Sequence, residues 1–174
     1  ILNAAGVPNP PAFFTGYFNN FTGALRSVSG TNTWRGAVDL RSFDGTARTF
    51  FIGVDAGELT IDGSVVGTTN ASAALGNNLV KVGGGTLVFG GAAPNLYTGF
   101  TAVLAGTLAL AKPAGANAIA GTLIVGDNLG TNDTVEIRAA EQIANTAQLQ
   151  VQSSGRLILT NTVVAVPLSN DIQT

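Results

Sequence analysis

Short runs in which apolar and polar residues alternate recur along most of this chain. The clearest run lies between Leu79 and Leu110 and reads LVKVGGGTLVFGGAAPNLYTGFTAVLAGTLAL. In its first half Val80, Val82, Leu87 and Phe89 alternate with smaller or polar residues. A period of two is typical of a half-buried β-strand. The plan of strand, glycine turn and strand occurs twice, so a unit of roughly twenty residues is repeated, which indicates a solenoid.

Further strand patterns fall into two interleaved series, and short turns that usually contain glycine join each pair. The first series comprises Leu25–Val28, Phe50–Gly53, Leu79–Val82, Thr101–Leu104, Thr122–Val125 and Gln148–Gln152. The second series comprises Ala37–Leu40, Glu58–Ile61, Thr86–Phe89, Thr107–Leu110, Thr134–Arg138 and Arg156–Thr160. Within either series, successive strands begin roughly 20 to 30 residues apart, which is the spacing of a repeat protein.

The expected fold is all-β, a parallel β-helix of about six coils in which each series stacks on itself. Alternation predicts these inward residues: Leu59, Ile61, Leu87, Phe89, Leu108, Leu110, Val135, Ile137, Leu149, Val151, Leu157 and Leu159. It predicts that Thr60, Thr86, Glu136, Gln148 and Gln150 face water. A jelly roll or sandwich of short strands is the main competing architecture.

The first residues differ from the rest, so we divide the chain into residues 1–23 and residues 24–174. The Pro8-Asn9-Pro10-Pro11 stretch cannot continue a helix or occupy a central strand. Five of the twelve aromatic residues then lie between Phe13 and Phe21. This irregular, Pro/Phe-rich segment has two interpretations, a cap whose rings close one end of the core or an arm that docks on a neighbouring molecule.

Composition removes several classes of function. Only 10% of the residues are charged and the net charge is −2, so no nucleic-acid partner is expected. The chain contains no Cys and no His, the usual ligands of zinc and copper, and we predict no metal and no cofactor. No apolar run is long enough to cross a bilayer, so we predict no membrane insertion by this segment. Position 1 is not Met, so the chain is expected to be processed or part of a longer protein.

Acidic residues are the candidates for catalysis, because hydrolytic β-helices use paired carboxylates. The acids are Asp39, Asp44, Asp55, Glu58, Asp62, Asp127, Asp133, Glu136, Glu141 and Asp171. Most lie in turns, where Asp is favoured for local backbone bonding, so we predict no catalytic residues and no enzyme. The DNLGTND stretch could supply oxygen ligands to calcium, but it lacks an EF-hand glutamate and is interpreted as a turn. Trp34 could stack on a sugar or cover the edge of a core.

One stretch resembles a known family. The residues that carry the resemblance are Lys81, Gly83-Gly84-Gly85-Thr86-Leu87, Tyr97-Thr98-Gly99, Thr101 and Gly106-Thr107-Leu108. In order and spacing they are similar to the autotransporter-associated β-strand repeat, also called the passenger-associated transport repeat. Phe100 and Val82 depart from the usual pattern of this repeat. The resemblance implies a right-handed parallel β-helix in the secreted passenger region of a bacterial surface protein.

The expected role is structural: a stalk or filament segment of an extracellular β-helix at the bacterial cell surface. The alternatives are an adhesin module that binds glycans or surfaces, and a carbohydrate-active enzyme. The expected partners are further coils of the same protein or a second copy stacked head to tail, with glycans or cell-surface components as further candidates. The apolar stretch Val163–Leu168 suggests that the C-terminal end is not capped.

Overall fold

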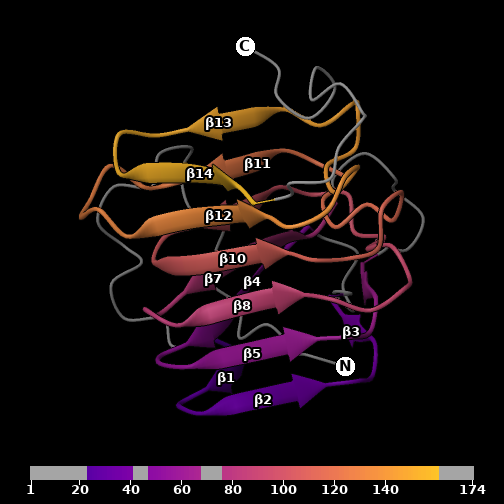
Figure 1. The fold of residues 1–174 in the computed structure, drawn as a ribbon, viewed down its shortest axis with the longest axis horizontal. Helices are drawn as coiled ribbons and strands as arrows, with labels where there is room; N and C mark the ends of the chain where they lie inside the picture. Colours follow the sequence, from indigo (N-terminus) through magenta and orange to yellow (C-terminus); the bar gives the residue numbers. More distant parts are fainter. Residues whose placement is uncertain (1–22, 41–46, 68–75, 161–174) are drawn as a thin grey trace.

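The chain forms a parallel β-helix, shown as a ribbon in Figure 1. This computed structural model describes residues 23–40, 47–67 and 76–160. Two stacks of parallel strands face each other across one core, and the chain winds around it in a right-handed sense (Figure 1). The expected fold class, all-β with stacked parallel coils, is confirmed. No helix in the described part of the chain is long and apolar enough to cross a membrane.

The described residues make two six-stranded sheets and one two-stranded sheet. Sheet A contains β1 (Leu25–Ser27), β4 (Thr49–Val54), β7 (Asn78–Val82), β9 (Thr101–Val103), β11 (Leu123–Val125) and β13 (Leu149–Val151). Sheet B contains β2 (Thr31–Trp34), β5 (Glu58–Ile61), β8 (Thr86–Phe89), β10 (Gly106–Leu110), β12 (Asp133–Ile137) and β14 (Gly155–Leu159). Sheet C contains β3 (Val38–Asp39) and β6 (Val65–Val66).

The register places equivalent residues of successive coils directly above one another. Leu87 of β8 pairs with Leu108 of β10, and every pair of neighbouring strands in the three described sheets is parallel. The sequence prediction of separate stacking is therefore confirmed. Two inward rows run up sheet B: Asn32, Leu59, Leu87, Leu108, Val135 and Leu157 in one, and Trp34, Ile61, Phe89, Leu110, Ile137 and Leu159 in the other.

The predicted inward residues of the last coil are the exception to burial. Leu149 and Leu157 are only half-buried, and Val151 and Leu159 are 49% and 41% exposed. The equivalent residues one coil earlier, Val125 and Ile137, are 0% and 3% exposed. The register itself was predicted correctly, but a row loses its cover where no further described coil lies above it.

The second strand series begins earlier than predicted. Its first member is Thr31–Trp34, not Ala37–Leu40, because the chain reverses at Gly30, whose φ of 79° suits a tight turn. Val38–Asp39 instead pairs with Val65–Val66 in sheet C, on a third side of the coil. Trp34 therefore lies on a strand and pairs with Ile61.

The two faces of β7 were also assigned incorrectly. Leu79 belongs to the central core, whereas Val80 and Val82 form a separate buried cluster on the other face of sheet A. The error arises because both faces of this strand are apolar, so alternation does not say which one faces inward.

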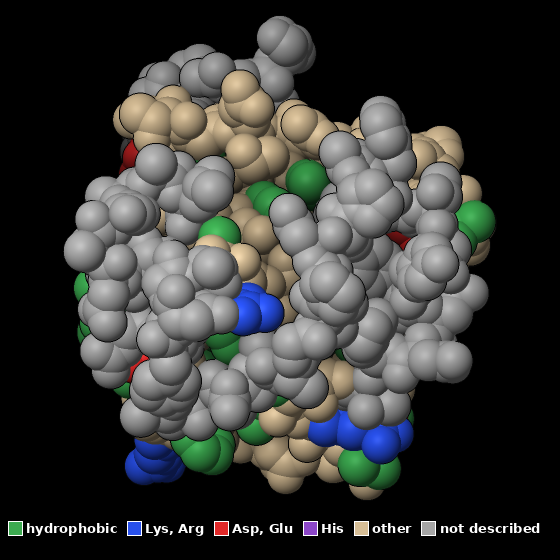
Figure 2. Space-filling view, turned by 180° about the vertical axis from the view of Figure 1, so that it is seen from behind, with side chains coloured by type: hydrophobic (Ala, Val, Ile, Leu, Met, Phe, Trp, Pro, Cys, Tyr) green, Lys and Arg blue, Asp and Glu red, His purple; other side chains and the backbone are tan. Residues whose placement is uncertain are grey.

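Figure 2 shows the molecule from behind, where few of the described side chains are charged.

Two sequence predictions concern regions that are not described. The Pro/Phe-rich segment lies outside the described residues except for Gly23, and so does Val163–Leu168. The division of the chain at residue 23 therefore stays a prediction.

Candidate functional site between the coils

Lys81 is the most unusual residue of the core. It lies in an inward row of sheet A, where it pairs with Ile52 below and Val103 above, and it is fully buried. Its Nζ donates hydrogen bonds to the carbonyl oxygens of Val82 at 3.1 Å, Gly83 at 2.6 Å and Ala105 at 2.9 Å. An ammonium group has three donors, so its hydrogen-bonding capacity is matched inside the protein.

The three acceptors of Lys81 come from two successive coils. Val82 ends β7, Gly83 begins the turn between β7 and β8, and Ala105 lies in the turn between β9 and β10. One side chain thus joins two stacked turns from within. Because truncation would leave buried carbonyl groups without this donor, Lys81 is a structural clamp between the coils.

Glycines permit these turns to stack closely. Gly83 and Gly106 have φ values of 82° and 70°, which L-residues with side chains rarely adopt. A Cβ at Gly83 would lie 2.4 Å from the carbonyl oxygen of Val54, and a Cβ at Gly106 would lie 2.5 Å from that of Gly83. Positive φ and close backbone approach therefore both require glycine at these two positions.

The surroundings of Lys81 alter the proton affinity of buried charges. Burial lowers the pKa of Lys81 to about 8, while the negative charges of Asp133 and Asp55 act in the opposite direction. Burial raises the pKa of Asp133, which a hydrogen bond with Ser154 partly offsets. One carboxylate oxygen of Asp133, Oδ2, is buried without a hydrogen-bond partner. Lys81 and Asp133 are thus two buried residues of opposite charge that act on each other electrostatically.

A second contact closes the loop between β8 and β9. Tyr97 is fully buried, and its hydroxyl oxygen lies 2.6 Å from Oγ1 of Thr101. Burial raises the pKa of Tyr97, so the phenol stays neutral at ordinary pH. A Cβ at Gly99 would lie 2.2 Å from the carbonyl oxygen of Asn77, so the loop packs directly on the preceding coil.

Buried amide side chains join the coils on the side where sheet C ends. Asn95 accepts a hydrogen bond from the backbone N–H of Val65 at 2.9 Å and donates to the carbonyl oxygen of Ala118 at 2.8 Å. The Gln142 side chain bonds both the N–H and the C=O of Lys112, as a neighbouring strand would. Amide side chains thus substitute for strand pairing on this side.

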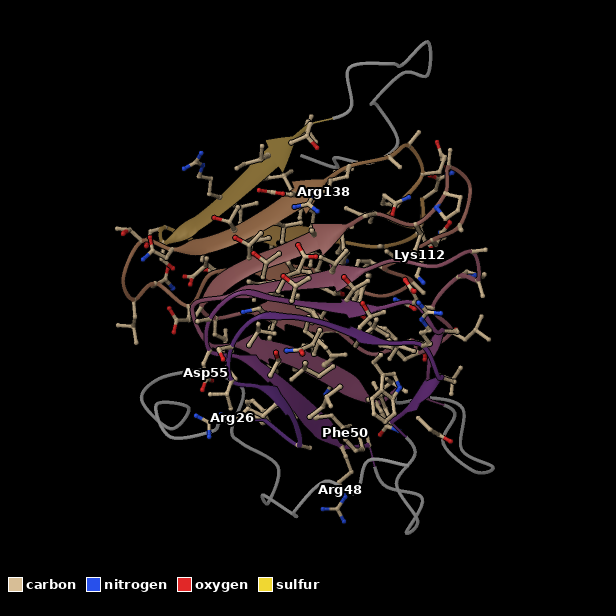
Figure 3. The ribbon with its side chains drawn as sticks, turned by 60° about the horizontal axis from the view of Figure 1, so that its bottom comes forward. Arg26, Arg48, Phe50, Asp55, Lys112 and Arg138 are labelled. Atoms are coloured by element: carbon tan, nitrogen blue, oxygen red, sulfur yellow. The ribbon has the colours of Figure 1, made fainter. Side chains whose placement is uncertain are left out.

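Lys112 is a second buried lysine. It is 1% exposed, and its Nζ donates to the carbonyl oxygen of Gly90 at 2.6 Å. Burial lowers its pKa, and the charge of Asp62 opposes this. Figure 3 shows Lys112 at one side of the coil and the exposed Arg26 with its ion-pair partner Asp55 toward the other. Sequence reasoning missed Lys112, although it follows Leu108 and Leu110 at inward parity.

The carboxylates that could have formed a catalytic pair have local structural contacts. Glu58 accepts a hydrogen bond from the Thr60 hydroxyl, and Asp127 accepts one from the backbone N–H of Leu129. Glu136 pairs with Arg138. Asp44 and Asp171 lie outside the described residues.

The DNLGTND stretch forms a turn that is hydrogen-bonded to the next coil. Asn128 has a φ of 67°, and its side-chain oxygen accepts hydrogen bonds from the backbone and hydroxyl of Ser153. The Ser154 hydroxyl in turn accepts from the backbone N–H groups of Asp127 and Asn128. Within the described ranges, no group of three acidic, His or Cys side chains is placed to hold a metal ion.

Comparison with protein-family models decides the identity of this clamped region. Residues 79–110 match the model of the passenger-associated transport repeat. The chain carries a passenger-associated transport repeat. Comparisons with curated proteins and with solved structures gave no match. The repeat indicates an exported protein of the autotransporter-associated type.

Residues by which the sequence resembles the passenger-associated transport repeat hold successive coils together. They are Lys81, Gly83, Gly85, Tyr97, Gly99, Thr101 and Gly106. The sequence identified these residues as a motif, but not that Lys81 points inward or that it reaches the carbonyl group of Ala105. In this chain the repeat is therefore a device for stacking one coil on the next.

Proposed function

We propose that this chain is a structural segment of an exported β-helical protein, and that its C-terminal end continues into further coils. The observation that supports this proposal most strongly is the open edge of the last described coil. Within the described residues, β13 and β14 have a strand neighbour on one side only. Unpaired edges of this kind are normally covered, because they are templates for pairing with another strand.

The inward residues at this edge are apolar. Val151 and Leu159 are 49% and 41% exposed, although they occupy rows that are buried in the preceding coil. Covering them with another coil would remove apolar surface from water, at about 25 cal/mol per Å². Backbone pairing and apolar burial therefore favour the same neighbour, a coil of the same kind.

The first described coil ends differently. Of its two inward positions in sheet B, one is occupied by Trp34 and the other by Asn32, whose amide donates to Ser27 Oγ and to the carbonyl oxygen of Ser29, both at 2.9 Å. Every residue of β2 is exposed. One inward position of β2 is thus polar, whereas both inward positions of β14 are leucine, and this difference favours addition of a coil at the C-terminal end.

Sedimentation of the chain comprising residues 1–174 tests this proposal. We expect the average mass to rise with concentration, because in the absence of further coils a second copy can cover the open edge. Head-to-tail contact uses two different surfaces and need not close, so a series of oligomers is expected, not one dimer.

A matched pair of variants locates the contact. Leu159→Lys places a charge on the inward side of the edge strand and should abolish association. Leu129→Lys changes a leucine of similar exposure, 53%, in the loop between β11 and β12, and should leave association intact. A mass that stays monomeric at all concentrations, or equal behaviour of the two variants, would contradict the proposal.

The two alternatives receive less support from the geometry. Trp34, the candidate for glycan stacking, lies in the inward row below Ile61 and Phe89, so it covers the end of the core. Glu58, Asp127 and Glu136, three of the carboxylates considered for catalysis, have the structural contacts described above. That the chain is not an enzyme stays a prediction, which incubation with acidic and neutral polysaccharides would test.

A further inference from the structure

The outer face of sheet A carries an apolar row where a β-helix usually has polar residues. The residues stacked in register there are Phe51, Val80, Ala102 and Ile124. The corresponding outer row of sheet B contains Glu58, Thr86, Thr107, Thr134 and Arg156. The two sheets share one core, so the difference between their outer faces is not explained by packing of the interior.

This outer row is also buried. Phe51 is 8% exposed, and Val80 and Ala102 are 0% exposed. Together with Val82 they form a hydrophobic cluster separate from the core, flanked by Phe100, Leu104 and Ile124. The described strands that contact sheet A lie beside its strands or across the core, so none of them covers this face.

The position at which the chain enters the β-helix points to the covering segment. Ala24 immediately precedes β1 at the edge of sheet A, and its N–H donates to the carbonyl oxygen of Phe51 at 2.8 Å. The chain therefore arrives beside the first member of the apolar row. Residues 1–22 precede this point and include the five aromatic residues between Phe13 and Phe21.

The length and the composition of residues 1–22 both suit a segment that covers this apolar row. An extended chain covers about 3.3 Å per residue, and neighbouring strands lie about 4.8 Å apart, so fewer than ten residues could cross the four strands of the row. Aromatic side chains bury large apolar areas on such a surface. The other segments outside the described ranges, residues 41–46, 68–75 and 161–174, contain one aromatic residue, Phe43.

We propose that the N-terminal aromatic segment lies across the outer face of sheet A and covers the row from Phe51 to Ile124. The segment is then a second layer on the flank of the β-helix. It is neither a plug at the end of the core nor an arm that docks on a neighbouring molecule. This placement leaves the outward edges of β13 and β14 uncovered.

Disulfide trapping in the full chain tests the proposal, because the natural chain has no Cys. Cysteine is introduced at Phe14, Phe18 or Phe21 in turn, each combined with Val80→Cys. We expect an intramolecular disulfide in at least one combination, identified by peptide mapping of the monomer. The yield of this disulfide should be at least about ten times the yield in the matched set with Thr107→Cys, which lies on the outer face of sheet B. The reason is that a covering segment has a high effective concentration at Val80.

Ile124→Cys, at the half-buried end of the row, replaces Val80→Cys if the latter fails to fold as judged by circular dichroism. Three results would overturn the proposal. They are equal yields at the two sheets, no disulfide at sheet A in any combination, and disulfides that join two copies. The last result would assign the row to a second molecule.

Discussion

Replacing Leu108 with Asp is expected to lower the free energy of unfolding by about 4 kcal/mol or more, because it places a carboxylate without a partner in an apolar interior. Leu108 is 0% exposed and lies between Leu87 and Val135 in an inward row. The charge would therefore separate three successive coils. Urea unfolding followed by circular dichroism measures the loss.

The neighbouring residue supplies the control for this prediction. Thr107 is half-buried and lies on the outer face of the same strand, between Thr86 and Thr134. Thr107→Asp should cost less than about 1 kcal/mol, as surface substitutions usually do. Similar losses in the two variants would show that the inward and outward faces of sheet B are reversed.

Gly106→Ala is expected to destabilise the chain by about 3 kcal/mol, from left-handed backbone strain and overpacking together. Gly106 has a φ of 70°, and a Cβ there would lie 2.5 Å from the carbonyl oxygens of both Gly83 and Gly85. Backbone atoms cannot rotate away as a flexible side chain can. The coils would have to separate at the turn that Lys81 joins.

Gly130→Ala separates strain from crowding. Gly130 has almost the same φ, 69°, but a Cβ there would have no atom within 4 Å. Only the conformational cost remains, about 1 kcal/mol. Denaturant midpoints of the two variants give the comparison, and an equal shift would mean that close stacking at Gly106 contributes nothing.

Alternation predicted the interior of sheet B well and that of sheet A poorly, for a physical reason. In β8 and β10 one face carries only Leu and Phe side chains while the other includes Thr86 and Thr107, so the side that faces the core is evident from the sequence. In β7 the residues Leu79, Val80 and Val82 are all apolar, and Lys81 shares the inward face with Leu79. A lysine is expected to face water unless its ammonium has partners, and those partners are backbone groups that no sequence pattern reveals.

The side-chain contacts between coils could not be predicted from the sequence either. Lys81 reaches Ala105, 24 residues away, and the amide of Gln142 bonds Lys112, 30 residues away. Which residues meet at these separations depends on how long each loop is and how it folds. The first strand of sheet B was misplaced for a related reason, since the end strand Thr31–Trp34 is polar and exposed and lacks the alternation that marks buried strands.

Hydrogen exchange at two adjacent amides of the last coil tests whether the outward edge of β14 is open in the monomer. The N–H of Thr160 donates to the carbonyl oxygen of Ile137, so it should exchange slowly. Neighbouring residues of a parallel strand bond to opposite sides, so the N–H of Leu159 faces away from β12. In a dilute sample Leu159 should exchange at nearly the rate of an unfolded peptide, and it should become protected where sedimentation detects association. Slow exchange at Leu159 in the dilute monomer would contradict the account, because the edge would then be covered from within the chain.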